Sequence, residues 1–239
     1  MINELEKIKD SVLLQDIKVE ELSSMLGCLR GVIKHYKKGE EVLSEGAEIK
    51  KFGLLTEGKL QIVQYDYLGN KSILSIIEPK QIFAEAYAYV NKIPSMNVEA
   101  LVDSTVLFLD SDKLSSPCQN CCSFHKQLVK NLLFIISNKN VNLTEKIECM
   151  AKRTTKEKLL TFLSLESIKQ NSKEFYIQYD RQALADYLGV ERSAMSAELS
   201  KLKNEGILEY NKNWEKDFLW LEEKTLAFKK AFCPFININ

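Results

Sequence analysis

The chain has 239 residues, of which 45% are hydrophobic and 28% charged, and this is the composition of a globular protein with a substantial core. That length is comfortable for two domains. The formal net charge is zero, which argues against a protein that coats nucleic acid nonspecifically. Any contact with nucleic acid would therefore come from local basic clusters.

The N-terminal residues MINELEKIKD lack the apolar core of a signal peptide. No apolar stretch elsewhere approaches the length of a membrane span. We therefore expect a cytoplasmic protein without membrane contact, in which cysteines are reduced thiols or ligands rather than a disulfide framework.

From Val32 to Asp110 the chain consists of short β-rich runs separated by glycines. Gly58 separates the runs FGLLT and KLQIVQY, and Gly69 lies in the turn between KLQIVQY and SILSII. Short strands at this spacing predict a small antiparallel barrel or roll. His35 falls within one predicted strand, where we expect an ordinary packed or exposed side chain.

A cysteine cluster follows, in which Cys118, Cys121 and Cys122 precede His125 in the pattern C-x-x-C-C-x-x-H. Thiolates and an imidazole at this spacing can converge on zinc or contribute to an iron–sulfur site, and a redox switch is a further alternative. A single cluster lacks the second ligand pair of a zinc module, and thiols often fill protein cores. We therefore expect no bound metal here.

The segment from Ser123 to Lys152 has no glycine or proline and predicts a long helix. Its apolar residues recur at helical spacing and predict one apolar seam, made of Leu128, Leu132, Ile135, Leu143, Ile147 and Met150. The run from Ser137 to Asn142 contains weak helix formers and is a candidate bend or break. Thr154 and Glu157 have capping-box spacing, which predicts a new helix through Leu165.

The run from Asp180 to Gly206 predicts two short helices joined by a sharp turn. Asp180 is placed to cap a first helix that ends at Leu188, and Gly189 suits the left-handed stop after it. Ala185 falls where two crossing helices would be closest, and its small side chain permits the approach.

The second helix is expected to begin at Glu191 or Arg192 and to end at Asn204, with Met195, Leu199 and Leu202 as its buried stripe. Its opposite face carries small and polar side chains, which suit close contact with base edges and phosphates in a major groove. An ordinary helical hairpin with a solvated face would fit the same pattern. The candidate DNA-contacting residues are Gln182, Glu191, Arg192, Ser193, Ser196, Ala197, Ser200 and Lys201.

Two strand-like runs after Gly206, ILEYNKN and DFLWLEE, predict a two-stranded wing. The local basic cluster beside the second helix would consist of Lys201, Lys203, Lys212 and Lys216. Arg192 is the best candidate for a bidentate contact to guanine, and the alternative is a solvated arginine in the first turn of a helix.

This helix pair and wing behind a roll resemble the Crp/Fnr family of bacterial transcription regulators. The residues that carry the resemblance are Arg181, Gln182, Ala185, Tyr187, Leu188, Gly189, Arg192, Ser196, Leu199, Leu202, Gly206 and Ile207. The resemblance covers nearly the whole chain and implies an α+β protein. Residues 1–117 would form a jelly-roll-like antiparallel β-roll sensor of the cyclic-nucleotide-binding type, 118–152 the connecting and dimerisation helix, and 153–239 the winged helix-turn-helix domain.

The resemblance implies a homodimeric, sequence-specific regulator, not an enzyme, that binds a double-stranded DNA operator, contacts RNA polymerase and senses a small-molecule effector. No phosphate loop or nucleophile elbow indicates catalysis. The alternative is a ligand-, metal- or redox-sensing module that acts through protein contacts. In the family the recognition helix often opens with an Arg-Glu pair and carries a second arginine five positions after the first. Here Ser193 follows Arg192 and Ala197 occupies the second arginine position, so the usual base code does not transfer.

The sensor also departs from the family pattern. Members that bind cyclic nucleotides have Phe-Gly-Glu at a strand-to-helix junction and an Arg-Ser or Arg-Thr pair about ten residues later. The candidate effector-pocket residues here are Phe83, Ala84, Glu85, Ser95 and Met96, and Pro94 occupies the arginine position. A proline offers no charge and no donor to a buried phosphate, so we expect no useful affinity for cyclic AMP. Glu85 either serves this pocket or only caps a short helix. The sequence identifies neither the effector nor a cofactor, and an aromatic or other small anion is one alternative for the effector.

Overall fold

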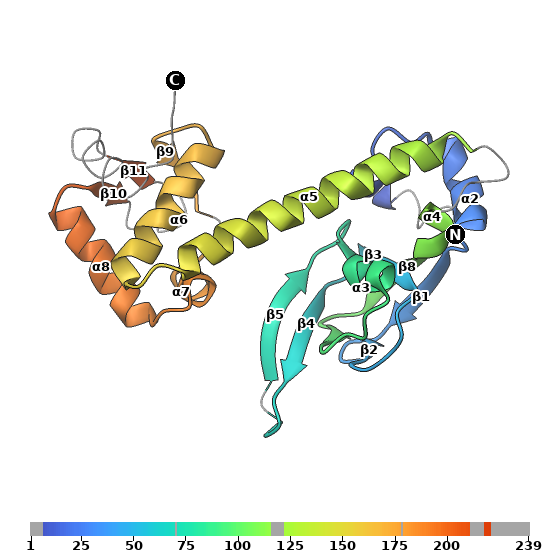
Figure 1. Ribbon diagram of the computed structural model, residues 1–239, viewed down its shortest axis with the longest axis horizontal. Helices are drawn as coiled ribbons and strands as arrows, with labels where there is room; N and C mark the ends of the chain where they lie inside the picture. The colour runs from blue at the N-terminus through green and yellow to red at the C-terminus, as the bar shows by residue number, and fades with distance from the viewer. Residues whose placement is uncertain (1–6, 70, 116–121, 178, 211–217, 221–239) are drawn as a thin grey trace. The chain divides into compact units, whose positions relative to one another are not determined.

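The computed structural model describes residues 7–69, 71–115, 122–177, 179–210 and 218–220 (Figure 1). Contacts within the chain divide it into two compact units, Met1–Ser137 and Asn138–Asn239. The helix α5 (Phe124–Met150) begins in the first unit and ends in the second. Within the described part of the chain, no helix has both the length and the apolar character that crossing a membrane requires.

The first unit contains two antiparallel four-stranded sheets, with strand orders β1-β8-β3-β6 and β2-β7-β4-β5 (Figure 1). The strands are β1 (Val32–Tyr36), β2 (Glu41–Leu43), β3 (Lys51–Glu57), β4 (Leu60–Tyr65), β5 (Lys71–Ile77), β6 (Ile82–Phe83), β7 (Asn97–Ala100) and β8 (Ser104–Asp110). Two short helices, α3 (Glu85–Val90) and α4 (Ser111–Ser115), follow β6 and β8. The predicted antiparallel roll is confirmed.

The roll shares one apolar core with the helices around it. The 3-10 helix η1 (Val12–Leu14) and the helix α2 (Val19–Cys28) precede the strands. The core includes Leu22 and Met25 of α2, Phe52 and Leu107 of one sheet, Leu60 and Val98 of the other, and Leu128 of α5. Burial of these side chains against both sheets fixes the first turns of α5 on the roll.

The turn between β3 and β4 requires glycine. Gly58 has φ +91°, and a Cβ added there would lie 2.2 Å from Ser104 Oγ and 2.5 Å from the carbonyl oxygen of Asp103. Both distances are far below van der Waals contact, and the backbone conformation itself disfavours other residues.

The described part of the second unit contains the end of α5, three further helices and a small sheet. The helices are α6 (Thr155–Lys169), α7 (Arg181–Leu188) and α8 (Arg192–Asn204). The strands β9 (Glu174–Phe175), β10 (Leu208–Tyr210) and β11 (Phe218–Trp220) form an antiparallel sheet in the order β10-β11-β9. The predicted helix pair and wing strands are confirmed, although the lysines Lys212 and Lys216 lie outside the described residues. Strand β9 was not predicted, because two residues are too few for an alternating pattern.

The predicted caps define these helices. The Asp180 carboxylate accepts from the Ala183 N–H at 2.7 Å, and Gly189 ends α7 with φ +60°. At α6 the Thr154 hydroxyl accepts from the Glu157 N–H at 3.2 Å, and the Glu157 carboxylate accepts from the Thr154 N–H at 3.0 Å. This capping box holds a helix that extends past the expected end at Leu165.

The expected bend or break at residues 137–142 is wrong, because α5 continues without interruption from Phe124 to Met150. Serine and asparagine cost up to about 0.7 kcal/mol each relative to alanine inside a helix. With no glycine or proline nearby, the hydrogen bonds of the neighbouring turns outweigh that cost.

The predicted apolar seam of α5 is divided between two faces. Leu128 and Leu132 are buried in the core of the first unit, whereas Leu143, Ile147 and Met150 are exposed. Apolar residues recur around more than one side of this helix, and spacing alone does not tell which side meets the roll.

We expect the substitution Gly58→Ala to destabilise the first unit by roughly 2 to 5 kcal/mol, because it combines left-handed strain with overpacking. Thermal unfolding followed by circular dichroism would measure this as a lower transition temperature. Gly27→Ala is the matched control, because a Cβ at Gly27 in α2 meets nothing within 4 Å. A Gly58→Ala protein as stable as the control would contradict the steric argument.

Candidate DNA-binding surface and effector pocket

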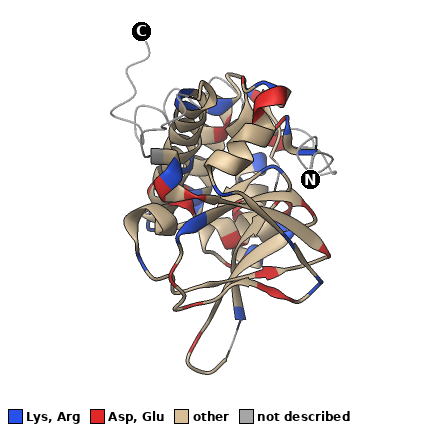
Figure 2. Cartoon of the chain, turned by 90° about the vertical axis from the view of Figure 1, so that its right-hand side faces the viewer, with Lys and Arg blue, Asp and Glu red and all other residues tan. Residues whose placement is uncertain are grey.

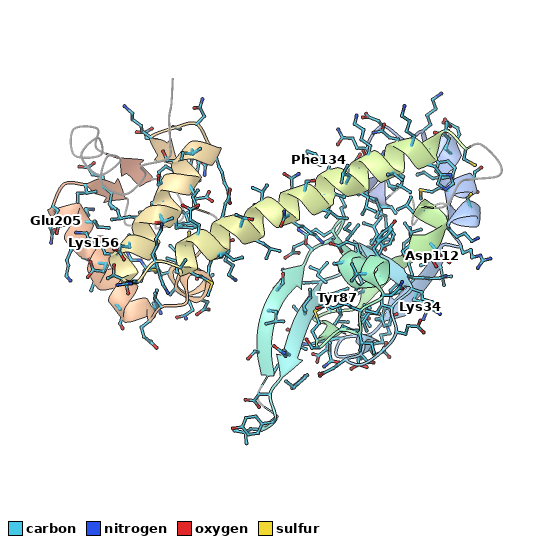
Figure 3. The ribbon with its side chains drawn as sticks, viewed as in Figure 1. Lys34, Tyr87, Asp112, Phe134, Lys156 and Glu205 are labelled. Atoms are coloured by element: carbon cyan, nitrogen blue, oxygen red, sulfur yellow. The ribbon has the colours of Figure 1, made fainter. Side chains whose placement is uncertain are left out.

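The helix α8 is held from its inner side by α6 and α7. The fully buried contact residues are Leu184, Ala185 and Leu188 of α7 and Met195, Leu199 and Leu202 of α8. Ala185 is fully buried, as expected for a small residue at the crossing of α7 and α8. Lys156 of α6 forms an ion pair of 3.1 Å with Glu205, which directly follows α8 (Figure 3). This packing leaves the opposite face of α8 at the surface.

An aromatic cluster supports α7 from behind. The ring of Tyr187 lies 5.6 Å from that of Phe162 and 5.2 Å from that of Tyr179, measured between centroids. The Lys146 ammonium lies 5.2 Å from the centroid of the same ring. Burial raises the pKa of Tyr187 above its ordinary value, so the phenol stays protonated and serves packing.

The predicted DNA-contacting residues are at the surface. Gln182, Glu191, Arg192, Ser193, Ala197, Ser200 and Lys201 are exposed, and Ser196 is half-buried. The Ser200 hydroxyl donates to the carbonyl oxygen of Ser196 at 2.9 Å, and Lys201 Nζ lies 2.6 Å from Glu198 Oε1. That hydrogen bond raises the pKa of Lys201, which stays charged. Arg192, in the first turn of α8, forms no ion pair with any described residue, so its guanidinium is available to a ligand.

The two signs of charge are interspersed over the described residues. Figure 2 shows basic and acidic positions next to one another on strands and helices alike, as the zero net charge leads one to expect. Attraction to DNA therefore has to come from individual groups such as Arg192 rather than from a uniformly basic surface.

Three of the predicted pocket residues meet at the junction between β6 and α3. Phe83 is buried and packs edge-on against Phe108, with ring centroids 6.2 Å apart. Ala84 is also buried and has φ +62°, a left-handed conformation that a glycine would adopt at lower cost. Glu85 opens α3 and is 6% exposed. The junction thus keeps a left-handed backbone at Ala84.

The other predicted pocket residues lie in the loop before β7. Pro94 is buried, and its carbonyl oxygen accepts from the Gly46 N–H at 3.0 Å. Ser95 is exposed and Met96 is half-buried. Across residues 1–137 the sequence contains one arginine, Arg30, which lies between α2 and β1. No guanidinium is therefore available from this loop to neutralise a phosphate.

The structure changes the composition of the cysteine cluster. Cys118 and Cys121 lie outside the described residues, whereas Cys122 and His125 lie at the start of α5. Cys28, the last residue of α2, joins them, and the ligand atoms of these three residues all lie within 4.8 Å of one another. Sequence spacing did not place Cys28 in the cluster, because the whole roll separates it from Cys122 along the chain.

The other described cysteine and histidine have ordinary environments. Burial, with smaller effects from Glu148 and Glu145, raises the pKa of the Cys149 thiol to about 11, so this thiol is protonated and packed in the second core. His35 Nδ1 lies 3.0 Å from the Thr105 hydroxyl, which fits its predicted role as an ordinary strand residue.

A surface cleft of about 500 Å³ lies beside His35, at one end of β1, β3 and β8. Its carboxylates are already paired, since Glu57 lies 2.8 Å from Lys7 and Asp103 lies 2.8 Å from Lys37. None of the predicted pocket residues around Glu85 lines this cleft.

Known families and structures match both units. Residues 33–121 match the family described as cyclic nucleotide-binding domain, and residues 157–226 match the family described as Crp-like helix-turn-helix domain. No curated protein matches the sequence.

Solved structures that are similar in fold include the following two. A variant of CprK complexed with OCPA has 16% sequence identity and a TM-score of 0.62, covering 87% of this chain and 93% of that chain. A double mutant of CooA from Carboxydothermus hydrogenoformans has 18% identity and a TM-score of 0.57, covering 90% of this chain and 96% of that chain. At these identities the likeness concerns the fold.

The order of the two matched domains along one chain, with the long α5 between them, is the order found in Crp/Fnr proteins. This chain belongs to the Crp/Fnr family of DNA-binding transcription regulators, in which a cyclic-nucleotide-binding-like domain precedes the DNA-binding domain.

Proposed function

We propose that this protein is a homodimeric regulator that reads a specific DNA operator with α8 and responds to an effector other than a cyclic nucleotide. The observation that carries this proposal is the outward face of α8, which has small and polar side chains and the exposed Arg192, a residue without an ion pair to any described residue. RNA polymerase is the partner through which a bound regulator of this family would act on transcription.

The exposed face of α8 suits the major groove. Ser193 offers a hydroxyl group to phosphates or base edges, and the small side chain of Ala197 lets the helix backbone approach closely. Arg192 in the first turn can donate two parallel hydrogen bonds to guanine. Because Ser193 and Ala197 replace charged groups of the usual family pattern, we expect an operator different from that of typical members.

A heptad seam along α5 supports the homodimer. Its residues alternate in spacing between four and three and are all exposed: Val129, Leu133, Ile136, Asn140, Leu143, Ile147 and Met150. Leu133 is 65% and Ile147 66% exposed, which is costly for side chains of this size in a single chain. A strict repeat of this kind pairs two helices into a coiled coil, and one asparagine within it fixes their register. Asn140 holds that position.

The junction residues support an effector without a cyclic phosphate. The buried Pro94 supplies neither charge nor side-chain donor, and the first unit has no arginine besides Arg30. An unneutralised phosphate in such a site would lose its hydration without compensation. CprK, which is similar in fold, is described as complexed with OCPA, and this supports a small molecule as the effector here.

The DNA contact can be tested by selecting binding sequences from random DNA with the full chain. We expect Arg192→Ala to weaken binding of the dimer to the selected operator by roughly 30-fold or more, the equivalent of two guanine contacts of about 1 to 3 kcal/mol each. Binding to random DNA at the same salt concentration should change much less. Fluorescence anisotropy would measure both constants, with Arg30→Ala as the control. If no sequence binds more tightly than random DNA at physiological salt, the proposed function fails.

The seam can be tested through the molecular mass in solution. Ile147→Lys removes two buried isoleucines per dimer, about 4 kcal/mol in total, and should weaken the dimer by roughly 1,000-fold. Analytical ultracentrifugation would then detect the monomer of 27.4 kDa where the wild type is dimeric. Ile168→Lys, on α6 and 48% exposed, is the control that should stay dimeric. A dimer that tolerates Ile147→Lys would exclude this seam.

Isothermal titration with cyclic AMP tests the effector proposal. We expect no binding heat and no change in the melting temperature of the full chain. Because a ligand at about 100 times its Kd stabilises a protein by about 2.7 kcal/mol, a millimolar addition would reveal even a weak complex. Binding with micromolar or tighter affinity would refute the proposal for the pocket, while leaving that for α8 in place.

A further inference from the structure

We propose that Cys28, Cys122 and His125 form a binding site for a single divalent ion of the zinc class. The three residues come from two elements that are far apart in the sequence: Cys28 ends α2, Cys122 precedes α5, and His125 lies in the first turn of α5. Their ligand atoms lie within 4.8 Å of one another, inside the first unit.

The spacing of the donors is close to that of a zinc centre. Zn–S bonds of about 2.3 Å and Zn–N bonds of about 2.0 Å in a tetrahedron separate the ligand atoms by roughly 3.5 to 3.8 Å. Atoms that already lie within 4.8 Å need to approach by about 1.3 Å at most, which side-chain rotation allows. Three protein ligands leave a fourth position for water or a small ligand.

The imidazole of His125 provides an independent indication of a ligand. Both of its ring nitrogens are buried, and neither has a hydrogen-bond partner among the described residues. Buried polar atoms in folded proteins are normally bonded, so an unbonded pair on one ring calls for a partner. The ring packs against Phe124, with centroids 4.6 Å apart, which limits the directions in which its nitrogens point. A metal ion between the ring and the two sulfurs would satisfy one of these nitrogens.

The donor set favours one ion over a cluster. Iron–sulfur clusters are usually held by four thiolates. The described residues provide two sulfurs and one imidazole here, a combination that suits zinc and other ions that accept both soft sulfur and nitrogen ligands.

The scaffold around the site is already in place. The Ser123 hydroxyl donates to the Glu21 carboxylate, which ties the start of α5 to α2. Further along, the Asn131 amide donates to the carbonyl oxygens of Leu13 at 2.9 Å and Gln15 at 2.7 Å. The ligands therefore lie on α2, on α5 and directly before α5, in segments that other bonds hold together, as a preorganised site requires.

A bound ion would cross-link α2 to the beginning of α5. The same helix carries the exposed seam further along, so occupancy of the site would stabilise the part of α5 from which the dimer is built. This regulatory consequence rests on the proposed dimer, whereas ion binding itself does not.

Metal binding to the full chain tests the site directly. Protein purified under reducing conditions and stripped with a chelator should take up one equivalent of Zn²⁺, measured by competition with a chromophoric chelator. Co²⁺ in place of zinc should give the intense visible bands of a tetrahedral thiolate complex. Zinc should also protect Cys28 and Cys122 from alkylation, which peptide mass spectrometry of the wild type reports without any substitution.

Variants identify the ligands. Cys28→Ser, Cys122→Ser and His125→Ala should each weaken Zn²⁺ binding by at least about 100-fold, since each removes one of three protein ligands. Cys149→Ala and His35→Ala are the controls, because Cys149 lies in the other core and His35 on a strand, and both should bind as the wild type does. Cys28→His should retain measurable binding, because it restores a ligand.

Several results would overturn the proposal. Undiminished binding in Cys28→Ser would place the ion elsewhere, on ligands that do not include α2. Iron with acid-labile sulfide in anaerobically purified protein would indicate a cluster instead. A Cys28–Cys122 disulfide that persists under reducing conditions, or the lack of any zinc-dependent protection of the two thiols, would equally exclude an ion at this position.

Discussion

The continuous hydrogen-bonded backbone of α5 is the constraint on which both units of this protein depend. Leu128 near its start belongs to the core of the first unit, and Cys149 near its end belongs to the core of the second. A break in the middle would separate these two anchors. Neither glycine nor proline interrupts residues 124–150. Weak helix formers such as Asn140 therefore stay helical, because the turns on either side are already hydrogen-bonded.

The roll and the helix α8 depart from the family pattern in the same manner: the backbone is kept and the side chains differ. Ala84 has the left-handed conformation that suits glycine, and Pro94 stands where an arginine is expected. In the DNA-binding domain, α8 starts at Arg192, while Ser193 and Ala197 replace charged residues of the family pattern. Hydrogen-bonded caps and buried stripes maintain the architecture, and exposed side chains can change without disturbing them. The fold is therefore a weaker guide to ligand and operator than the individual residues are.

Much of the fold could be predicted because its signals are local. The cap at Asp180, the stop at Gly189 and the capping box at Thr154 each depend on residues within one turn of chain, and each lies where it was predicted. The roll was predictable from glycine-punctuated strands such as those around Gly58. Strand β9 escaped prediction because its pairing with β11 is long-range and its two residues carry no pattern of their own.

The caps of α6 and α7 and the face of α8 that stays outside could be read from the sequence alone, because helical period and capping act between neighbouring residues. Which apolar residues of α5 face the roll depends on tertiary packing, since Leu128 and Leu133 are chemically identical and one is buried while the other is exposed. Tertiary packing alone brought Cys28 to Cys122 and His125. The reason is the same in both cases: packing of α2 and α5 on the roll joins residues that no local pattern connects.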